Sequence, residues 1–189
     1  MIVHILSKLR GFFRAETGSA AIEFVLLMPV FFLLVTNSWE SGLLSTRQVM
    51  LERGVDMTVR EIRIGRIANP THAIISRTIC ENARIIPDCN QRIKVEMVRR
   101  DPRSWSALDA AADCVDLSNL GRPLRAFEVG GNNELMIIRA CILFDPLIPT
   151  NGLGRDIPKQ SQGKYALVAS SAYVLEPFKV TGTRTGAGS

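Results

Sequence analysis

A single carboxylate, Glu23, lies near the start of an otherwise apolar stretch, residues 18–36. As a helix, residues 19–36 would extend roughly 27 Å, close to the ~30 Å hydrocarbon core of a bilayer. An ionised carboxylate at the centre of that core costs about 2.5 to 3.5 kcal/mol and usually has a partner there. Two interpretations follow: Glu23 forms a charge pair within the membrane, or it lies at the headgroups of a plain anchor that begins at Phe24.

The four cysteines, Cys80, Cys89, Cys114 and Cys141, all follow this stretch. An even number of cysteines on the outer side of a membrane predicts two disulfides, because thiols are oxidised there. Of the three possible connectivities we favour Cys80 with Cys89 and Cys114 with Cys141, since the first pair closes a short loop across residues 87–88. Cys141 could instead be a small hydrophobic residue buried in an apolar strand.

Other site chemistry has less support in the sequence. A zinc site of His72 with Cys80, Cys89 and Cys114 would lack the Cys-x-x-Cys spacing of typical zinc ligands, so we expect no metal and no cofactor. His72 is then expected to be exposed in the first turn of a helix. No nucleophile with a base, no recognisable carboxylate pair and no phosphate-binding glycine loop appears, so we expect no catalytic residues and no enzyme.

Two clusters of charged residues are expected to lie on the solvent-exposed surface and not to form binding sites. Five basic residues gather near Trp105, namely Arg92, Lys94, Arg99, Arg100 and Arg103, but a single aromatic residue does not make a stacking groove, and we expect no nucleic-acid partner. Three acidic residues would share one helix face as an exposed surface: Asp109, Asp113 and Asp116. The net charge of +5 over 189 residues bears on solubility more than on partners.

The element that must position Glu23 is a transmembrane helix, expected at residues 19–38, that continues beyond the membrane. Three basic residues precede the apolar stretch, Lys8, Arg10 and Arg14, so the positive-inside rule places the N-terminus in the cytoplasm and the chain after Thr36 outside. Trp39 is placed like an interfacial anchor. Pro29 should kink the helix.

Beyond Trp39 the sequence predicts an amphipathic helical stalk, residues 39–66. Apolar residues recur there at helical spacing, while charged residues occupy the other faces: Leu44, Leu51, Val55, Val59 and Ile62 form the apolar stripe. Gly42 and Gly54 weaken the helix by roughly 1 kcal/mol each relative to alanine. The helix should end within Gly65–Pro70.

The order of the parts around Glu23 resembles the processing site of type IV prepilins. Basic residues precede Gly18, Glu23 is the fifth residue after it, Phe24 follows at once, and then comes the apolar run. With the polar continuation through Glu40, Leu43, Arg47 and Leu51, residues 14–60 are similar to the TadE-like proteins, the pseudopilins of tight-adherence (Flp) pilus systems.

The resemblance implies that a prepilin peptidase cuts after Gly18 on the cytoplasmic side. Residues 1–18 would be the leader, Ser19 the new N-terminus, and Glu23 the residue that pairs with the terminal amine of a neighbouring subunit. The implied partners are that peptidase, other pseudopilins, the pilus assembly machinery and the inner membrane. The major pilins of these systems tend to have tyrosine where this chain has Phe24, which favours a pseudopilin over a major pilin.

The remaining chain predicts a small α+β head, residues 67–180, outside the membrane. Short helices are expected at residues 71–85 and 106–115, and a strand at residues 93–97. Residues 127–129 and 135–144 should form a hairpin around Gly130–Asn133, followed by a polar loop at residues 151–163 and a strand at residues 165–175. We therefore expect a pilin-like α+β fold: a long N-terminal transmembrane helix, a stalk, an antiparallel sheet of about four strands, and a disordered tail at residues 181–189.

The main alternative is a secretory signal peptide or a plain anchor. Residues 24–35 could serve as the apolar region of a signal peptide, with cleavage near Thr36-Asn37-Ser38. The chain would then be a secreted periplasmic binding domain, or a bitopic envelope protein if it is not cut. We favour prepilin-type processing because Glu23 and Pro29 interrupt the signal-peptide pattern.

Overall fold

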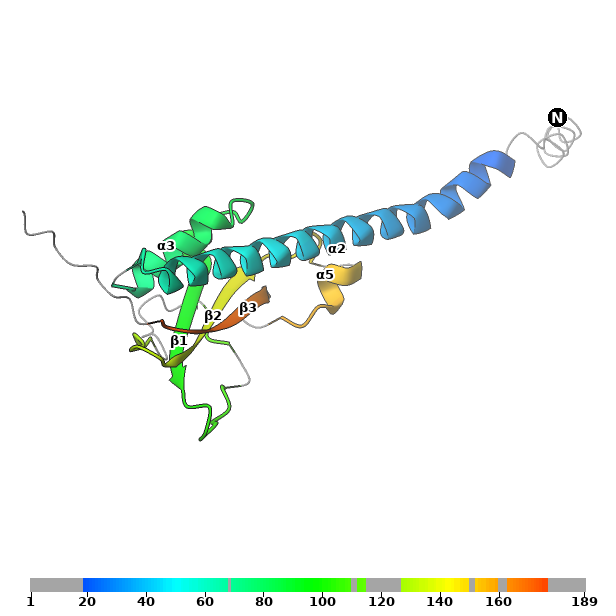
Figure 1. The fold of residues 1–189 in the computed structure, drawn as a ribbon. Helices are drawn as coiled ribbons and strands as arrows, with labels where there is room; N and C mark the ends of the chain where they lie inside the picture. The colour runs from blue at the N-terminus through cyan, green and yellow to red at the C-terminus, as the bar shows by residue number, and fades with distance from the viewer. Residues whose placement is uncertain are drawn as a thin grey trace, which may run out of the picture.

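The computed structural model describes residues 19–67, 69–109, 112–114, 127–149, 152–159 and 163–176. Its elements follow in the order α2 (Ser19–Arg63), α3 (His72–Asn82), α4 (Cys89–Arg92), β1 (Ile93–Arg100), β2 (Leu135–Phe144), α5 (Gly152–Asp156) and β3 (Tyr165–Val174). A long N-terminal helix thus precedes a small antiparallel sheet (Figure 1). The predicted α+β class, with stalk and head, is confirmed.

Helix α2 has 45 residues and runs through Pro29 without a break. At about 1.5 Å per residue it is roughly 68 Å long. Its N-terminal part projects away from the other elements, and the rest of the helix lies along α5, the sheet and α3 (Figure 1). One continuous helix therefore covers both the predicted membrane span and the predicted stalk. The boundary between span and stalk near residue 38 and the kink at Pro29 stay predictions.

The end of α2 is fixed by a glycine in the left-handed conformation. Gly65 has φ of 72°, and its N–H donates to the Ile62 carbonyl at 3.0 Å while the Arg66 N–H donates to the Glu61 carbonyl at 3.0 Å. This pair of bonds is the Schellman motif, which satisfies carbonyls at the end of a helix. Helix α2 therefore ends at Arg63, two residues before the predicted stop within residues 65–70, and Gly65 at the start of that range terminates it.

Helix α3 packs against α2 at Gly54. The N-cap Thr71 accepts a hydrogen bond from the Ile74 N–H at 3.3 Å, which begins the helix, and Ile75 and Ile79 are fully buried. A Cβ at Gly54 would lie 2.7 Å from the Ile79 carbonyl oxygen. The absence of a side chain at position 54 therefore allows the two helices to approach this closely.

The sheet has the strand order β1-β2-β3, and both pairings are antiparallel. In register, Val95 pairs with Ala140 and Ala140 with Ala169. Because side chains alternate across a strand, these three residues share the face that packs on α2. The predicted apolar stripe of α2 meets that face: Leu51, Val55, Val59 and Ile62 are buried, and Leu44 packs against the same core.

The predicted hairpin of residues 127–129 with residues 135–144 is wrong. Strand β2 pairs with β1 on one side and with β3 on the other, so neither of its edges remains for residues 127–129. Phe127 forms only an isolated parallel bridge with Met97 of β1. The Asn133 N–H in the turn donates to the Leu175 carbonyl at 2.8 Å, which fixes the turn to the end of β3. The described sheet therefore has three strands, where about four were expected.

Two further local predictions also need correction. The described residues 106–109 and 112–114 form no helix, because tertiary contacts of Asp113 and Cys114 hold the backbone against the sheet. The expected polar loop at residues 151–163 contains the short helix α5. Gly18, the leader, Asp116 and the tail at residues 181–189 lie outside the described residues.

Candidate membrane anchor and assembly site

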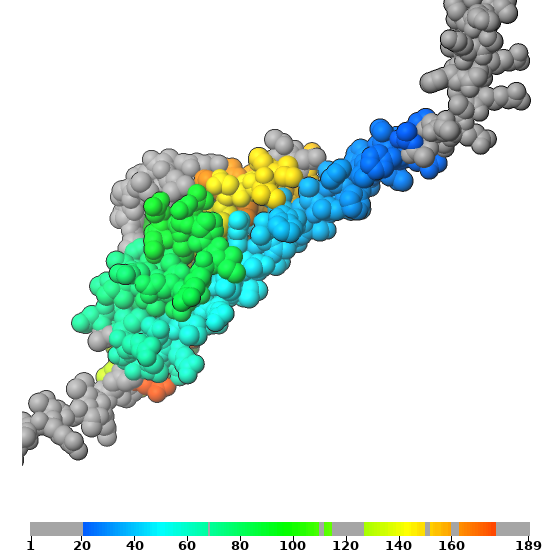
Figure 2. Space-filling model, turned by 90° about the horizontal axis from the view of Figure 1, so that it is seen from above, coloured from blue at the N-terminus to red at the C-terminus, as the bar shows by residue number. Residues whose placement is uncertain are grey.

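The first half of α2 exposes large apolar side chains, which are normally buried in a protein surrounded by water. Val25, Leu26 and Leu27 are 66%, 68% and 67% exposed, and Figure 2 shows this part of α2, in blue, as a narrow projection beyond the head. It is long and apolar enough to cross a membrane. Large exposed apolar patches mark membrane or protein interaction sites, so this surface is compatible with a bilayer or with other helices around it.

Glu23 lies about one turn from the first residue of α2, Ser19, and Phe24 beside it is exposed. Gly18 lies outside the described residues. Cleavage after Gly18 and the role of Glu23 in assembly therefore stay predictions.

Directly after the apolar stretch, two polar side chains of α2 attach the helix to the head. The Asn37 Oδ1 accepts a hydrogen bond from the Leu153 N–H of α5 at 2.8 Å. The Glu40 carboxylate is 3% exposed and accepts from the Leu147 N–H at 2.9 Å. A Cβ at Gly154 would lie 2.9 Å from the Glu40 Oε1, so a glycine there leaves room for the buried carboxylate.

Arg47 makes the next attachment along the same face of α2. Its guanidinium donates to the Tyr165 hydroxyl at 3.0 Å and lies 4.7 Å from the centre of the Phe144 ring, which gives a cation–π contact. Burial raises the pKa of the Tyr165 hydroxyl, although the Arg47 charge opposes the shift. The hydroxyl therefore stays protonated and accepts the arginine N–H.

Sequence reasoning named Asn37 only in the alternative cleavage site, and Glu40 and Arg47 only in the TadE-like segment, and it placed Arg47 on another face than the apolar stripe. It predicted no contact of these residues with the head, although a signal was present. The buried stripe of α2 continues toward its N-terminus at the same helical spacing, through Leu44, and these three polar residues occupy it. Polar residues within a buried stripe predict hydrogen-bonded partners. Extending the stripe would therefore have indicated that the head reaches back to residue 37.

The structure joins the four cysteines in the pairs that we favoured. Cys80 is bonded to Cys89, with 5.6 Å between their Cα atoms, and Cys114 is bonded to Cys141, with 5.1 Å. The first disulfide ties α3 to α4, and the second ties residues 112–114 to the face of β2 that points away from α2. Since all four sulfurs are bonded in pairs, the alternative zinc set that includes His72 is not assembled.

His72 is the first residue of α3, but it is not exposed as predicted. It is half-buried, its Nε2 accepts the Val95 N–H at 3.2 Å, and its ring meets the Phe127 ring edge-on at 5.9 Å between centroids. Burial, and to a lesser extent the charge of Lys94, lowers the pKa of His72 below its ordinary value. The neutral imidazole acts here as a structural acceptor.

The outer face of the sheet buries charges that sequence reasoning placed at the surface. Lys94 of β1 pairs with Asp113 at 2.8 Å, and both side chains are almost fully buried. The Arg139 Nε donates to Glu96 at 2.6 Å, also with little exposure. The Asp113 N–H donates to Glu96 at 3.2 Å, which explains why this segment is not helical.

Two further members of the basic cluster, Arg92 and Arg99, are also paired with acidic groups. Arg92 lies 3.3 Å from Asp145, and Arg99 lies 2.8 Å from Glu134. Hydrogen bonds from the Gly131 N–H and from Arg99 lower the pKa of Glu134. These pairs reduce the positive charge that the sequence places near Trp105.

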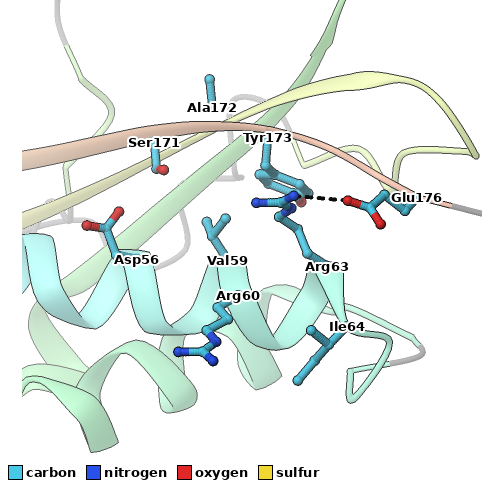
Figure 3. Close-up of a pocket in the computed structure, with 9 residues that line it drawn as sticks. All are labelled: Asp56, Val59, Arg60, Arg63, Ile64, Ser171, Ala172, Tyr173 and Glu176. Carbon is cyan, nitrogen blue, oxygen red and sulfur yellow. Dashed lines mark hydrogen bonds and ion pairs between the residues drawn. The ribbon is translucent and has the colours of Figure 1, made fainter.

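A groove of about 510 Å³ lies between the end of α2 and β3 (Figure 3). Arg60 and Asp56 lie on its helical wall, and an ion pair of 3.0 Å between Arg63 and Glu176 joins the two walls. Burial raises the pKa of Tyr173 on the opposite wall to about 12. Both charged and apolar side chains line the groove. This lining does not indicate a particular class of ligand.

Fold and site together define a protein with an N-terminal apolar helix that continues as a stalk into a disulfide-bonded α+β head. Residues 18–60 match the model of a family described as TadE-like protein. The match spans most of α2, including Glu23, Glu40 and Arg47, and confirms the resemblance for this segment; the head lies outside it. Comparisons with the curated proteins and with the solved structures found no match.

Proposed function

We propose that this chain is a TadE-like pseudopilin, a structural and assembly protein of a tight-adherence (Flp) pilus, and not an enzyme. It is anchored in the bacterial inner membrane by residues 19–38, with a cytoplasmic N-terminus and a periplasmic head. Prepilin peptidase removes residues 1–18, and the mature chain joins other pseudopilins and the assembly machinery, or the pilus itself, in support of surface adhesion. The match of residues 18–60 to the TadE-like family carries the proposal.

The exposed apolar half of α2 supports a subunit that moves between two apolar surroundings. The same side chains, such as Leu26 and Leu27, can face lipid before assembly and the helices of neighbouring subunits afterwards, because both bury apolar surface. Among the described residues, the contacts of the head with α2 begin at Asn37 and Glu40 and continue toward the C-terminal end of the helix (Figure 1). The apolar residues before Asn37 thus remain available for contact with other helices.

Glu23 gives such assembly a specific register. A cut after Gly18 creates a new α-amino group at Ser19, and in an apolar bundle that amine and the Glu23 carboxylate of a neighbour stabilise each other. Either charge left unpaired in a low-dielectric bundle costs several kcal/mol. The pair therefore favours one axial offset between adjacent subunits over others.

The head contacts of α2 favour an anchor over a cleaved signal peptide. Cleavage near Ser38 would remove Asn37, whose side chain accepts a hydrogen bond from Leu153 of the head. The two disulfides fit a head in the oxidising periplasm. The Asn37 contact suits a head that stays joined to its membrane helix, whereas the disulfides fit an anchored and a secreted head equally.

The proposal is tested by the variant Glu23→Ala, with Glu52→Ala as the matched control. Glu52 is an exposed carboxylate on the same helix but outside the apolar stretch. Glu23→Ala should reach the membrane in normal amount and be cleaved, yet the cells should lack pili in electron micrographs, while Glu52→Ala cells should have them. Normal pili with Glu23→Ala would reject the assembly role, and a plain anchor predicts that outcome.

A further inference from the structure

We propose that the base of the head docks on the lipid surface of the membrane in which α2 is anchored. The membrane-facing surface consists of Trp39, Leu147, Pro149, Arg155 and Lys159. The inference rests on the proposed membrane anchoring of α2 and is independent of the role in pilus assembly.

The height of this surface along α2 follows from two hydrogen bonds. The Asn37 side chain accepts a hydrogen bond from the Leu153 N–H, and the Glu40 carboxylate accepts one from the Leu147 N–H. The segment that carries α5 is therefore fixed to α2 at residues 37–40. If residues 19–38 span the bilayer, these attachment points lie within roughly 5 Å of its edge along the helix axis. Figure 1 shows α5 as the part of the head nearest to the projecting half of α2.

The side chains at this level have the composition of a membrane interface. Trp39 is 64% exposed and Leu147 is 55% exposed, and Pro149 is exposed on the same loop. Tryptophan is enriched at the headgroup level of bilayers, where an exposed leucine also gains from contact with lipid. Because Glu40 fixes the backbone of Leu147, this side chain is held beside the anchor.

The charges near the surface suit lipid phosphates. Arg155 and Lys159 are exposed cations within and just after α5, and basic residues close to a bilayer are attracted to anionic headgroups. Asp156 pairs with Arg155 at 3.1 Å and partly offsets its charge. Asp145 on the preceding loop is neutralised by Lys164 and Arg92, so it repels the headgroups less.

The opposite end of the head supplies a matched control position. Val129 is 60% exposed, and its neighbour Gly130 packs beside Leu175, which precedes the Glu176 that pairs with Arg63. Arg63 lies about 39 Å further along α2 than Asn37. Val129 is therefore as exposed as Leu147 but far from the bilayer.

The test uses the full chain in lipid nanodiscs that each hold one copy. Both natural tryptophans are replaced, as Trp39→Phe and Trp105→Phe, and a single tryptophan is introduced as Leu147→Trp, Phe32→Trp or Val129→Trp. Emission is compared in ordinary lipids and in lipids with brominated acyl chains, which quench tryptophans in contact with them. Pro149→Trp serves as a second reporter on the same loop in case Leu147→Trp does not fold.

We expect strong quenching at position 32, clear quenching with a blue-shifted emission maximum at position 147, and no change at position 129. Quenching at 32 without quenching at 147 and 149 would overturn the docked head and leave the anchor intact. No quenching at any position would overturn both. A blue shift at 147 that appears only in discs with several copies would assign this surface to a second copy, and would also overturn the proposal.

Discussion

Replacing Gly54 by alanine should destabilise the head, although alanine is the better helix former. Gly54 lies in the interior of α2, nine residues before its last residue Arg63, where it faces α3. In an exposed helix the change from glycine to alanine stabilises by about 0.5 to 1 kcal/mol. At position 54 the added methyl group would instead meet the backbone of α3.

The magnitude follows from the distances at the helix contact. The new Cβ would lie 2.7 Å from the Ile79 carbonyl oxygen and 3.1 Å from the Ala83 Cβ. Because a backbone oxygen cannot rotate away, α3 must shift, and such overpacking costs about 1 to 3 kcal/mol. After the gain in helix propensity, the free energy of unfolding should fall by up to about 2.5 kcal/mol.

The control is Gly42→Ala on the same helix. No atom lies within 4 Å of a Cβ at Gly42, so this variant should be unchanged or more stable by up to about 1 kcal/mol. Urea unfolding of the detergent-solubilised chain, with its disulfides intact, measures both variants by near-UV circular dichroism. If Gly54→Ala is as stable as Gly42→Ala, then α2 and α3 do not pack through Gly54.

Two further predictions concern single side chains of the head. Glu40→Ala leaves the Leu147 N–H without its acceptor and should lower the free energy of unfolding by about 1 to 3 kcal/mol. The control Asp56→Ala removes an exposed carboxylate and should change the free energy of unfolding by less than about 0.5 kcal/mol. Equal effects of the two variants in urea titrations would contradict the attachment of the Leu147 loop to Glu40. Burial, and to a lesser extent the charge of Lys94, lowers the pKa of His72 in the folded chain, so the unfolded chain takes up a proton more readily. The stability that this difference in pKa contributes is therefore complete above the unfolded pKa of about 6.5 and is lost as the pH falls through the folded pKa. The urea midpoint should drop in this range, and His72→Gln should flatten that part of the pH profile; an unchanged slope would show that His72 is not the group responsible.

The helical part of the fold could be predicted because its signal is periodic and local. The stripe from Leu51 to Ile62 identifies the face that packs on the sheet, and Gly65 marks the end of α2. The apolar stretch with Glu23 and Gly18 likewise identifies the candidate anchor from a short segment. Each of these signals depends only on residues near one another in the chain.

The sheet could not be predicted to the same extent, because its order depends on distant partners. Strand β2 is buried over most of its length, and a continuous apolar run does not reveal that it is the central strand with both edges occupied. The turn at Gly130–Asn133 gives the same local signal whether it closes a hairpin or, as here, bonds to Leu175. The strand pairing is decided by tertiary contact.

The buried charges were missed for a related reason. Lys94 and Glu96 alternate with apolar residues in β1, which predicts a solvent-facing side. In the structure residues 112–114 cover that side, and Asp113 and Arg139 supply the opposite charges. The covering segment is held by the Cys114–Cys141 disulfide, and nothing in the sequence of β1 indicates its presence.

The attachment of α2 to the head links the anchor to the proposed assembly role. Asn37, Glu40 and Arg47 bind α5, the loop before it and the start of β3, so the head is fixed in orientation relative to the helix. A subunit with this attachment would carry its head at a defined height when α2 packs among other helices. The processing of the N-terminus then decides whether Glu23 can act in that packing.

The most direct test of the central claim is the N-terminal mass of the chain purified from membranes of cells with and without the prepilin peptidase. The account predicts a mature chain that begins at Ser19 only when the peptidase is present. A chain that begins at Met1 in both strains would identify a plain anchor, and one that begins at Trp39 would identify a secreted domain. Either result would contradict the proposed pseudopilin.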